Sequence, residues 1–326
     1  MAAAKDAGSG SKGEFVRDER YLTTRITRDG RDGFPVEPGR YRLVVARACP
    51  WANRATIVRR LLGLEQAISL GVCGPTHDER SWTFDLDPGQ VDPVLGIKRL
   101  QQAFLARDPD YPLGITVPAM VDVPTGQVVT NDYAQLTLDL STEWAEFHRE
   151  GAPQLYPEAL RAEIDQVNDV VFRDVNNGVY RCGFAGSQQA YDAAFDRLFT
   201  TLARFDAVYH GHFKCNRNKL TEMPVLWAYA RDLFQTPGFG DTIDFVQIKQ
   251  HYYLVHTTIN PSQIVPDGPD LAGWFEPHNR AELGGRPFGD GTPPQSPPVD
   301  EMLTASWSSS TDRPGGPEGG PGVELD

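Results

Sequence analysis

The order of strand-like and helical patterns constrains the fold more than any other feature of this sequence. Four short β-rich runs and two helical patterns alternate as strand, helix, strand, long connection, strand, strand and helix. The first helix begins at Pro50 and ends at Gly63, and the second opens at Asn131-Asp132, whose side chains can accept hydrogen bonds from a helix start. This order is typical of a thioredoxin-like α/β domain. The expected strands are residues 41–46, 67–72, 115–121 and 127–130.

A second block of different pattern follows. Residues 160–172, 190–205 and 224–234 have helical spacing, and few alternating runs appear, so this block is expected to be all-α. The end of the chain is dominated by Gly, Pro, Ser and acidic residues, which offer too little apolar surface to offset the entropy of ordering. We therefore expect four parts, which are an N-terminal extension (1–38), a thioredoxin-like domain (39–148), an all-helical domain (149–283) and a disordered Gly/Pro-rich tail (284–326).

Charge and composition exclude several classes of partner. The chain of 326 residues has 31 Lys and Arg against 44 Asp and Glu, a formal net charge of −13, so no nucleic acid and no anionic membrane is expected as a partner. No stretch reaches the length of a spanning helix, and the first residues lack the apolar core of a secretory signal. Four cysteines are too few for a disulfide framework. We expect a reduced, cytoplasmic protein.

The sequence Ala-Cys-Pro-Trp-Ala-Asn-Arg at positions 48–54 carries the clearest chemical signal. Pro50 favours the first helical position, which makes Cys49 the N-cap, facing free amide N–H groups and the positive end of the helix dipole. This environment stabilises a thiolate and predicts a lowered thiol pKa, to which Arg54 adds positive potential. The alternative is a buried cysteine that acts as a small hydrophobic residue. Ala52 stands where a dithiol oxidoreductase has its second cysteine, so the expected chemistry is a mixed disulfide with a small thiol.

Several further motifs occur in one order between Tyr41 and Pro269. With the Cys-Pro-Trp helix start, they resemble the glutathione transferases that use a catalytic cysteine, and most closely the glutathionyl-hydroquinone reductases, or Xi class. The resemblance implies an α/β thioredoxin-like domain joined to an all-α domain, a homodimer, and glutathione or another low-molecular-weight thiol as co-substrate without a metal. The motifs are SWTF (81–84), TVP (116–118), NGVY (177–180), RFDAVYHGHFKCN (204–216), HYY (251–253) and INP (259–261).

The resemblance also implies a role for each matching residue. Cys49 corresponds to the nucleophile, and a cis bond between Val117 and Pro118 would leave the Val117 backbone free to pair with the cysteinyl residue of glutathione. A helix start at Asn131 and Asp132 would receive the γ-glutamyl end. The match there is partial, since the family has Asn-Glu-Ser. Trp82 is implied to line the glutathione site. The implied quinol pocket has three tyrosines, whose hydroxyl groups can bind an aromatic diol, namely Tyr180, Tyr209 and Tyr252.

The implied reaction removes glutathione from a glutathionyl-hydroquinone by attack of the Cys49 thiolate on sulfur, and a second thiol regenerates the enzyme. Two other interpretations stay open. One is an Omega-like thioltransferase or dehydroascorbate reductase that uses the same cysteine. The other is a non-catalytic transferase-like binding protein or an inactive deletion variant.

The alternative of a deletion variant is based on one departure of this sequence from the family pattern. The words at 196–202 (DRLFTTL) and 204–206 (RFD) follow one another directly, where the family has a long helix, a capping box and a second similar word between them. We therefore expect a shortened helical domain that is either poorly folded or altered. The nearby His210, His212 and Cys215 complete no familiar metal-ligand spacing, and no metal site is predicted.

Overall fold

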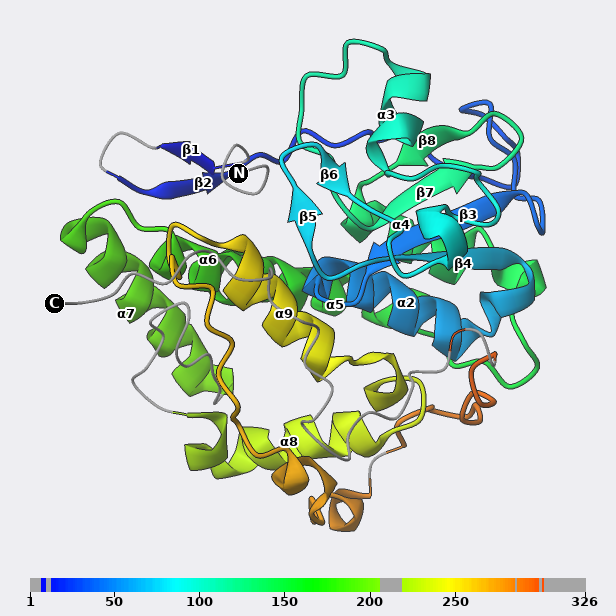
Figure 1. The fold of residues 1–326 in the computed structure, drawn as a ribbon. Coiled ribbons are helices and arrows are strands. Elements are labelled where there is room, and N and C mark those ends of the chain that lie inside the picture. Colours follow the sequence, from blue (N-terminus) through cyan, green and yellow to red (C-terminus); the bar gives the residue numbers. More distant parts are fainter. Residues whose placement is uncertain (1–6, 10–12, 206–218, 285, 299–300, 302–326) are drawn as a thin grey trace, which may run out of the picture.

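The structure is a computed structural model and describes residues 7–9, 13–205, 219–284, 286–298 and 301. A four-stranded sheet with its helices lies beside a second, helical part of the chain (Figure 1). The sheet has the strand order β4-β3-β7-β8, with β3 parallel to β4 and antiparallel to β7. This is the topology of a thioredoxin-like domain, as predicted. The strands are β3 (Tyr41–Ala46), β4 (Ile68–Cys73), β7 (Ala119–Asp122) and β8 (Gln127–Thr130).

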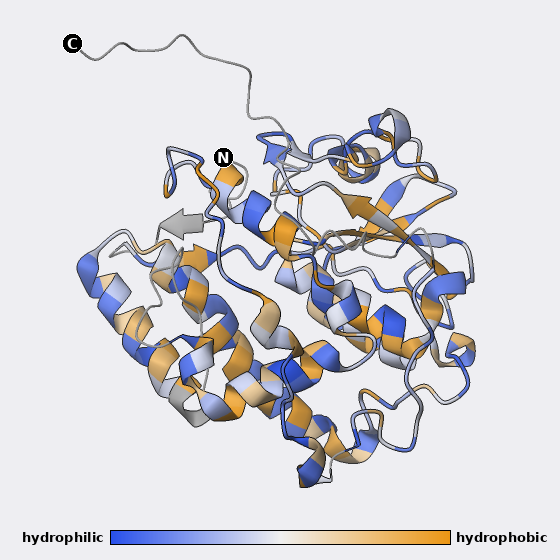
Figure 2. Ribbon diagram, turned by 60° about the horizontal axis from the view of Figure 1, so that its bottom comes forward, coloured by the Kyte–Doolittle hydropathy of each residue, from blue (hydrophilic) through white to orange (hydrophobic). Residues whose placement is uncertain are grey.

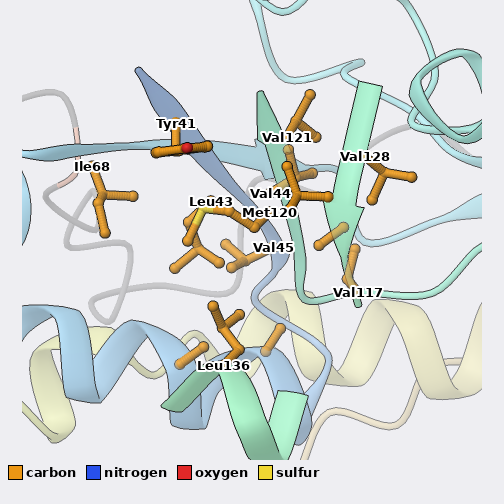
Figure 3. Close-up of a cluster of buried hydrophobic side chains, with 14 of the residues drawn as sticks. Tyr41, Leu43, Val44, Val45, Ile68, Val117, Met120, Val121, Val128 and Leu136 are labelled. Atoms are coloured by element: carbon orange, nitrogen blue, oxygen red, sulfur yellow. The ribbon is translucent and has the colours of Figure 1, made fainter. Parts of the chain in front are cut away.

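The sheet is buried because helices cover both of its faces (Figure 1). All six residues of β3 are buried, as expected for a central strand. Figure 3 shows Leu43 and Val45 of this strand in the space between the sheet and Leu136. The covering helices are α2 (Pro50–Leu62) and α4 (Tyr133–Thr142) on one face and α3 (Gln101–Arg107) on the other.

The sequence patterns located most of these elements and missed the short ones. Gly63 ends α2 in the left-handed conformation, with φ of 70°, and its N–H bonds the carbonyls of Arg59 and Arg60, so the predicted helix end is confirmed. The predicted long connection instead contains α3 and a two-stranded ribbon. The ribbon is formed by β5 (His77–Asp78) and β6 (Ser81–Trp82).

The N-terminal extension lies on both parts of the chain. Its hairpin of β1 (Ala7–Ser9) and β2 (Phe15–Arg17) contacts the helical part, and Gly186 N–H donates to the Gly13 carbonyl at 2.7 Å. Gly13 has φ of 77°, and a Cβ there would lie 2.9 Å from the Gly186 backbone, so only glycine fits. Further on, Ile26 is buried against the core of the sheet.

The second part is helical, as predicted, but its core is small. Five buried apolar side chains, all on α6 and α7, form its cluster. Within the described ranges, α5 and α8 bury no side chain and α9 buries His251 alone. Figure 2 shows hydrophilic and hydrophobic residues mixed along these helices. The helices are α5 (Arg161–Val170), followed by a π-helical segment (Val171–Asn176), α6 (Asn177–Gly183), α7 (Gln188–Phe205), α8 (Pro224–Gln235) and α9 (Phe245–Val255).

This small core agrees with the shortened helical domain predicted from the sequence. Amphipathic helices are stabilised mainly by burying their apolar faces, and here Val167 of α5, Val225 of α8 and Val246 of α9 are about half exposed or more. Within the described residues, the apolar faces of these three helices are therefore only partly covered.

The prediction of disorder from residue 284 is wrong for the first part of the tail. Arg149 donates to the carbonyl of Thr292, Arg60 donates to the carbonyl of Gln295, and Arg59 pairs with Glu301. Composition indicated too little apolar surface for order, but these segments dock through hydrogen bonds and ion pairs to arginines of the folded domain. Residues 302–326 lie outside the described part of the chain.

Candidate active site

Cys49 lies where the sequence predicts it, at the start of α2. Its backbone is extended, with φ of −95° and ψ of 115°, and its carbonyl accepts the first helical hydrogen bond from Asn53 N–H at 2.9 Å. The thiol lies across from the loop that enters β7, where Cys49 Sγ donates to the Val117 carbonyl at 3.4 Å. The bond between Val117 and Pro118 is cis, as predicted. The helix start and this loop thus meet at one sulfur atom.

The electrostatics of the thiol differ from the prediction. The backbone N–H groups of Ala52 and Trp51 at the helix start lower the pKa of the thiol, as a helix N-terminus should. Burial acts more strongly in the opposite direction, so the pKa of Cys49 is raised rather than lowered. Cys49 as a residue remains partly exposed, but its sulfur is buried. In the absence of ligand, the resting form at neutral pH is therefore the thiol.

The cation near the sulfur also differs from the prediction. The positive charge of Arg17 lowers the pKa of Cys49, whereas that of Arg54 lowers the pKa of Tyr133. Arg17 comes from β2 of the N-terminal extension, and its guanidinium carbon lies 4.4 Å from the ring centre of Tyr180 and 5.0 Å from that of Trp51. The extension therefore contributes a charged side chain beside the candidate nucleophile.

Two of the three predicted tyrosines gather at this point. Tyr180 of α6 is hydrogen-bonded to Tyr252 of α9 and to Trp51. Burial, followed by the nearby Cys49, raises the pKa of Tyr180, so its phenol keeps its proton at neutral pH. Tyr209 lies outside the described residues. The structure thus assembles a thiol, two phenols and a guanidinium from four distant segments of the chain.

Aromatic rings enclose this group of polar side chains. The Trp51 ring lies 4.7 Å from that of Tyr133 and 5.8 Å from that of Phe172, measured between centroids. On the other side, Phe15 lies 6.1 Å from Tyr180. Aromatic rings and phenol groups thus lie together around the thiol, and side chains of these kinds can contact an aromatic ring that carries hydroxyl groups.

Trp82 lies at the contact between the two parts of the chain. It is 8% exposed, and its ring lies 4.7 Å from that of His77 and 5.2 Å from that of His251, with which it stacks. His251 Nδ1 lies 2.8 Å from the Pro75 carbonyl oxygen. The predicted role of Trp82 as a wall of the glutathione site stays a prediction, because most of its surface is used in this stack.

Asn131 and Asp132 lie at the start of α4, as predicted. Asp132 is the N-cap and accepts from the Gln135 N–H at 3.2 Å. Asn131 is buried, its side-chain carbonyl accepts from Leu22 N–H at 2.7 Å, and its amide donates to Thr116 at 2.8 Å. Asn131 therefore connects the N-terminal extension to the loop of Val117, a positioning role that differs from direct contact with a ligand.

The other cysteines and the histidine-cysteine word add nothing to this site. Cys73 and Cys182 are buried, and burial raises the pKa of Cys73 well above its usual range. His210, His212 and Cys215 fall outside the described ranges. Within those ranges no group of three His, Cys, Asp or Glu side chains could hold a metal ion, and no helix is long and apolar enough to cross a membrane.

Sequence reasoning missed Arg17, Phe15 and Phe172. Residues 1–38 have no sustained period, so no element could be predicted that would carry Phe15 and Arg17 to the site. Phe172 belongs to the predicted helix 160–172, but its direction depends on the π-helical segment, which has no simple sequence signal. A Phe-x-Arg word in a glycine-rich, polar extension was the one available hint.

Known proteins resemble this chain over most of its length. Residues 48–140 match the family described as glutathione S-transferase, N-terminal domain. Glutathionyl-hydroquinone reductase YqjG of Escherichia coli is 37% identical over 307 residues, which cover 82% of this chain and 92% of that protein. The crystal structure of a glutathione transferase from Gordonia bronchialis is 67% identical, with a TM-score of 0.85, and covers 88% of this chain and 98% of that one. The glutathione-bound structure of E. coli YqjG is 36% identical, with a TM-score of 0.72, and covers 80% and 96%.

The alignment with E. coli YqjG is longer than the part of this chain that it includes. It spans 307 positions, whereas 82% of the 326 residues of this chain is fewer than 307. The E. coli protein therefore has residues that have no counterpart in this chain.

Proposed function

The chain belongs to the glutathionyl-hydroquinone reductase family of the glutathione transferases, and on that premise we propose that it removes glutathione from glutathionyl-hydroquinones with Cys49 as the nucleophile. The observation that carries the proposal is the meeting of the Cys49 thiol with the Tyr180–Tyr252 pair. An enzyme that only exchanged disulfides would need the thiol but would have no use for phenols beside it.

Glutathione would lie along the loop of Val117 and the start of α4. The Val117 carbonyl already accepts from the thiol, and the same backbone can pair with the cysteinyl residue of the tripeptide. The N-terminus of α4, with Asp132 as its cap, suits the carboxylate and amine of the γ-glutamyl end. The bound glutathione in the E. coli relative supports this tripeptide as co-substrate. Asp132 is shorter than the Glu of the family, so another low-molecular-weight thiol is a second candidate.

The reaction balances in two steps. The Cys49 thiolate attacks the sulfur of the thioether, a disulfide between Cys49 and glutathione forms, and the sulfur–aryl bond breaks with its electron pair on carbon. That carbon takes up one proton and leaves as the hydroquinone, so the ring is reduced by two electrons while sulfur is oxidised. A second glutathione thiolate then attacks the mixed disulfide, which releases glutathione disulfide and the Cys49 thiolate.

Tyr180 would assist the first step. Its raised pKa keeps the phenol protonated, so it can donate a hydrogen bond to a substrate hydroxyl and favour the tautomer in which the leaving carbon accepts a proton. An aryl carbon is a poor leaving group, and binding this tautomer must supply much of the acceleration. Tyr252, hydrogen-bonded to Tyr180, would orient the phenol.

An activity assay tests the proposal against the disulfide-exchange alternative. The full chain is incubated with a glutathionyl-hydroquinone and glutathione, and free hydroquinone and glutathione disulfide are measured by chromatography. We expect turnover by the natural chain, none by Cys49→Ala, and a reduced rate for Tyr180→Phe. Activity on a glutathione mixed disulfide without release of hydroquinone would favour the thioltransferase, and no activity on either substrate would favour the binding protein.

We further propose a homodimer in the cytoplasm. The family resemblance supports both, and size-exclusion chromatography with light scattering tests the first: a mass twice that of the 36.1 kDa chain is expected. A monomeric mass across the working concentration range would contradict it.

A further inference from the structure

We propose that Arg17 is a positioning cation of the active site, which stabilises the Cys49 thiolate from the N-terminal hairpin. This proposal rests on the proposed function, because the proposed reaction uses the thiolate of Cys49. It assigns a chemical role to an extension that otherwise has only a structural one.

The guanidinium of Arg17 is held in place from several sides. Its Nε donates to Asn177 Oδ1 at 2.6 Å, which ties β2 to α6 across 160 residues of sequence. Its faces lie against three aromatic rings, with the guanidinium carbon 4.4 Å from the centre of Tyr180, 5.0 Å from Trp51 and 5.7 Å from Phe15. Cation–π contacts of this kind fix a charge in space without neutralising it.

The partners of the Arg17 guanidinium differ from those of the buried arginines. Among the ion pairs of the described residues, the buried arginines Arg42, Arg59 and Arg60 each pair with a carboxylate, whereas Arg17 pairs with none. Its Nη2 is buried and has no hydrogen-bond partner within the described chain. Arg17 as a residue is only partly buried, but its unpaired Nη2 is a buried donor that can receive a negative charge formed nearby.

The field of Arg17 reaches the groups that react. It lowers the pKa of Cys49 and of Tyr180, and it acts in the same direction on Tyr21 and Tyr133. Other charges face this region from neighbouring elements. Arg54 acts on Tyr133, Glu19 on both Tyr21 and Tyr133, and Asp18 and Asp132 on Tyr21. At the sulfur itself, the positive charge of Arg17 lowers the thiol pKa in the same direction as the two amides at the helix start.

A cation at this position favours both steps of the reaction. In the first step it increases the fraction of Cys49 present as thiolate. In the second step Cys49 is the leaving group, and a leaving thiol of lower pKa departs faster from a mixed disulfide. A structural role alone, in which Arg17 merely docks the hairpin, would affect stability but not the ionisation of the thiol.

The test is the rate of Cys49 alkylation by iodoacetamide as a function of pH, followed by mass spectrometry of the Cys49 peptide. The full chain is compared with Arg17→Gln, which removes the charge, and with Arg17→Lys, which keeps it. Arg20→Gln is the matched control, since Arg20 lies on the same segment, is exposed and pairs with Asp18. Neither glutathione nor a quinol is present, so failure of the reductase assay leaves this result intact.

We expect Arg17→Gln to raise the pH midpoint of alkylation by about one unit, a tenfold loss of thiolate at neutral pH, as the loss of one partly buried charge beside the site should. Arg17→Lys should stay near the natural midpoint and Arg20→Gln should not move it. An unchanged midpoint in Arg17→Gln, or an equal shift in Arg17→Lys, would overturn the proposal. If Arg17→Gln does not fold, judged by circular dichroism, Arg17→Lys decides alone: a midpoint near the natural one supports the proposal and a shift of about one unit refutes it.

Discussion

The ion pair between Arg59 and Glu301 should stabilise the domain that carries Cys49, and Glu301→Ala tests this. The Arg59 side chain is fully buried on α2, and both of its terminal nitrogens donate to the two Glu301 oxygens at 2.7 Å. Its Nε donates to the Ile68 carbonyl at 2.7 Å, so the guanidinium cannot turn to solvent. Removing one partner of a buried pair leaves an uncompensated charge and costs about 3–5 kcal/mol.

Thermal unfolding followed by circular dichroism measures this cost. With an unfolding entropy of about 2 cal/mol/K per residue, a loss of about 3–5 kcal/mol corresponds to a fall in Tm of about 4–7 °C for a chain of 326 residues. Asp290→Ala is the matched control, because Asp290 lies on the same tail segment and pairs with Arg286 while both side chains are largely exposed. Its Tm should hardly change. Equal melting of Glu301→Ala and Asp290→Ala would refute the docking of the tail on α2.

Three further predictions concern the site and the helical part. Because burial raises the pKa of the Cys49 thiol, its alkylation at pH 7 should be slower than that of free glutathione and should keep rising above pH 9; a plateau below pH 7 would contradict this. The folded state should also lose stability as pH rises through that alkaline range, since the buried thiol ionises less readily than in the unfolded chain. Asn131→Ala removes two buried hydrogen bonds, to Leu22 and Thr116, and should lower the free energy of unfolding by about 2 kcal/mol in urea titrations, whereas an unchanged midpoint would exclude this positioning role. A chimera in which the residues of E. coli YqjG without a counterpart in this chain are inserted between residues 202 and 204 should melt at a higher temperature than the natural chain, and equal melting would refute the hypothesis of a missing core helix.

The thioredoxin-like part was predictable because its signals are local. A proline after Cys49 and a glycine at the end of α2 mark both ends of one helix, and Asp132 marks the start of another. The order of strands and helices between these markers predicted the thioredoxin-like sheet. The position of Cys49 opposite Val117 follows from that order, because Cys49 comes after the end of β3 and Val117 comes before the start of its antiparallel neighbour β7.

The charged environment of the site was not predictable in the same way. Arg54 is close to Cys49 in sequence, and Arg17 is not, yet Arg17 is the cation that acts on the sulfur. Its position depends on contacts with Asn177 and Tyr180 far along the chain, which no short window of sequence contains.

The arginine pair Arg59 and Arg60 shows why composition failed for the tail. Both side chains are buried on α2 and both pair with carboxylates. Their partners include Glu301, which lies in the segment predicted as disordered. Composition counts apolar surface and does not register a polar segment that docks through specific ion pairs.

Intact mass spectrometry tests the central claim, that Cys49 takes up the glutathionyl group, most directly. The full chain is mixed with a glutathionyl-hydroquinone in the absence of free thiol, and protein mass and free hydroquinone are measured together. We predict a mass increase of one glutathionyl group, located on the Cys49 peptide, with one equivalent of hydroquinone released, and neither in Cys49→Ser. Release of hydroquinone by Cys49→Ser, or an adduct located on another residue, would contradict the account.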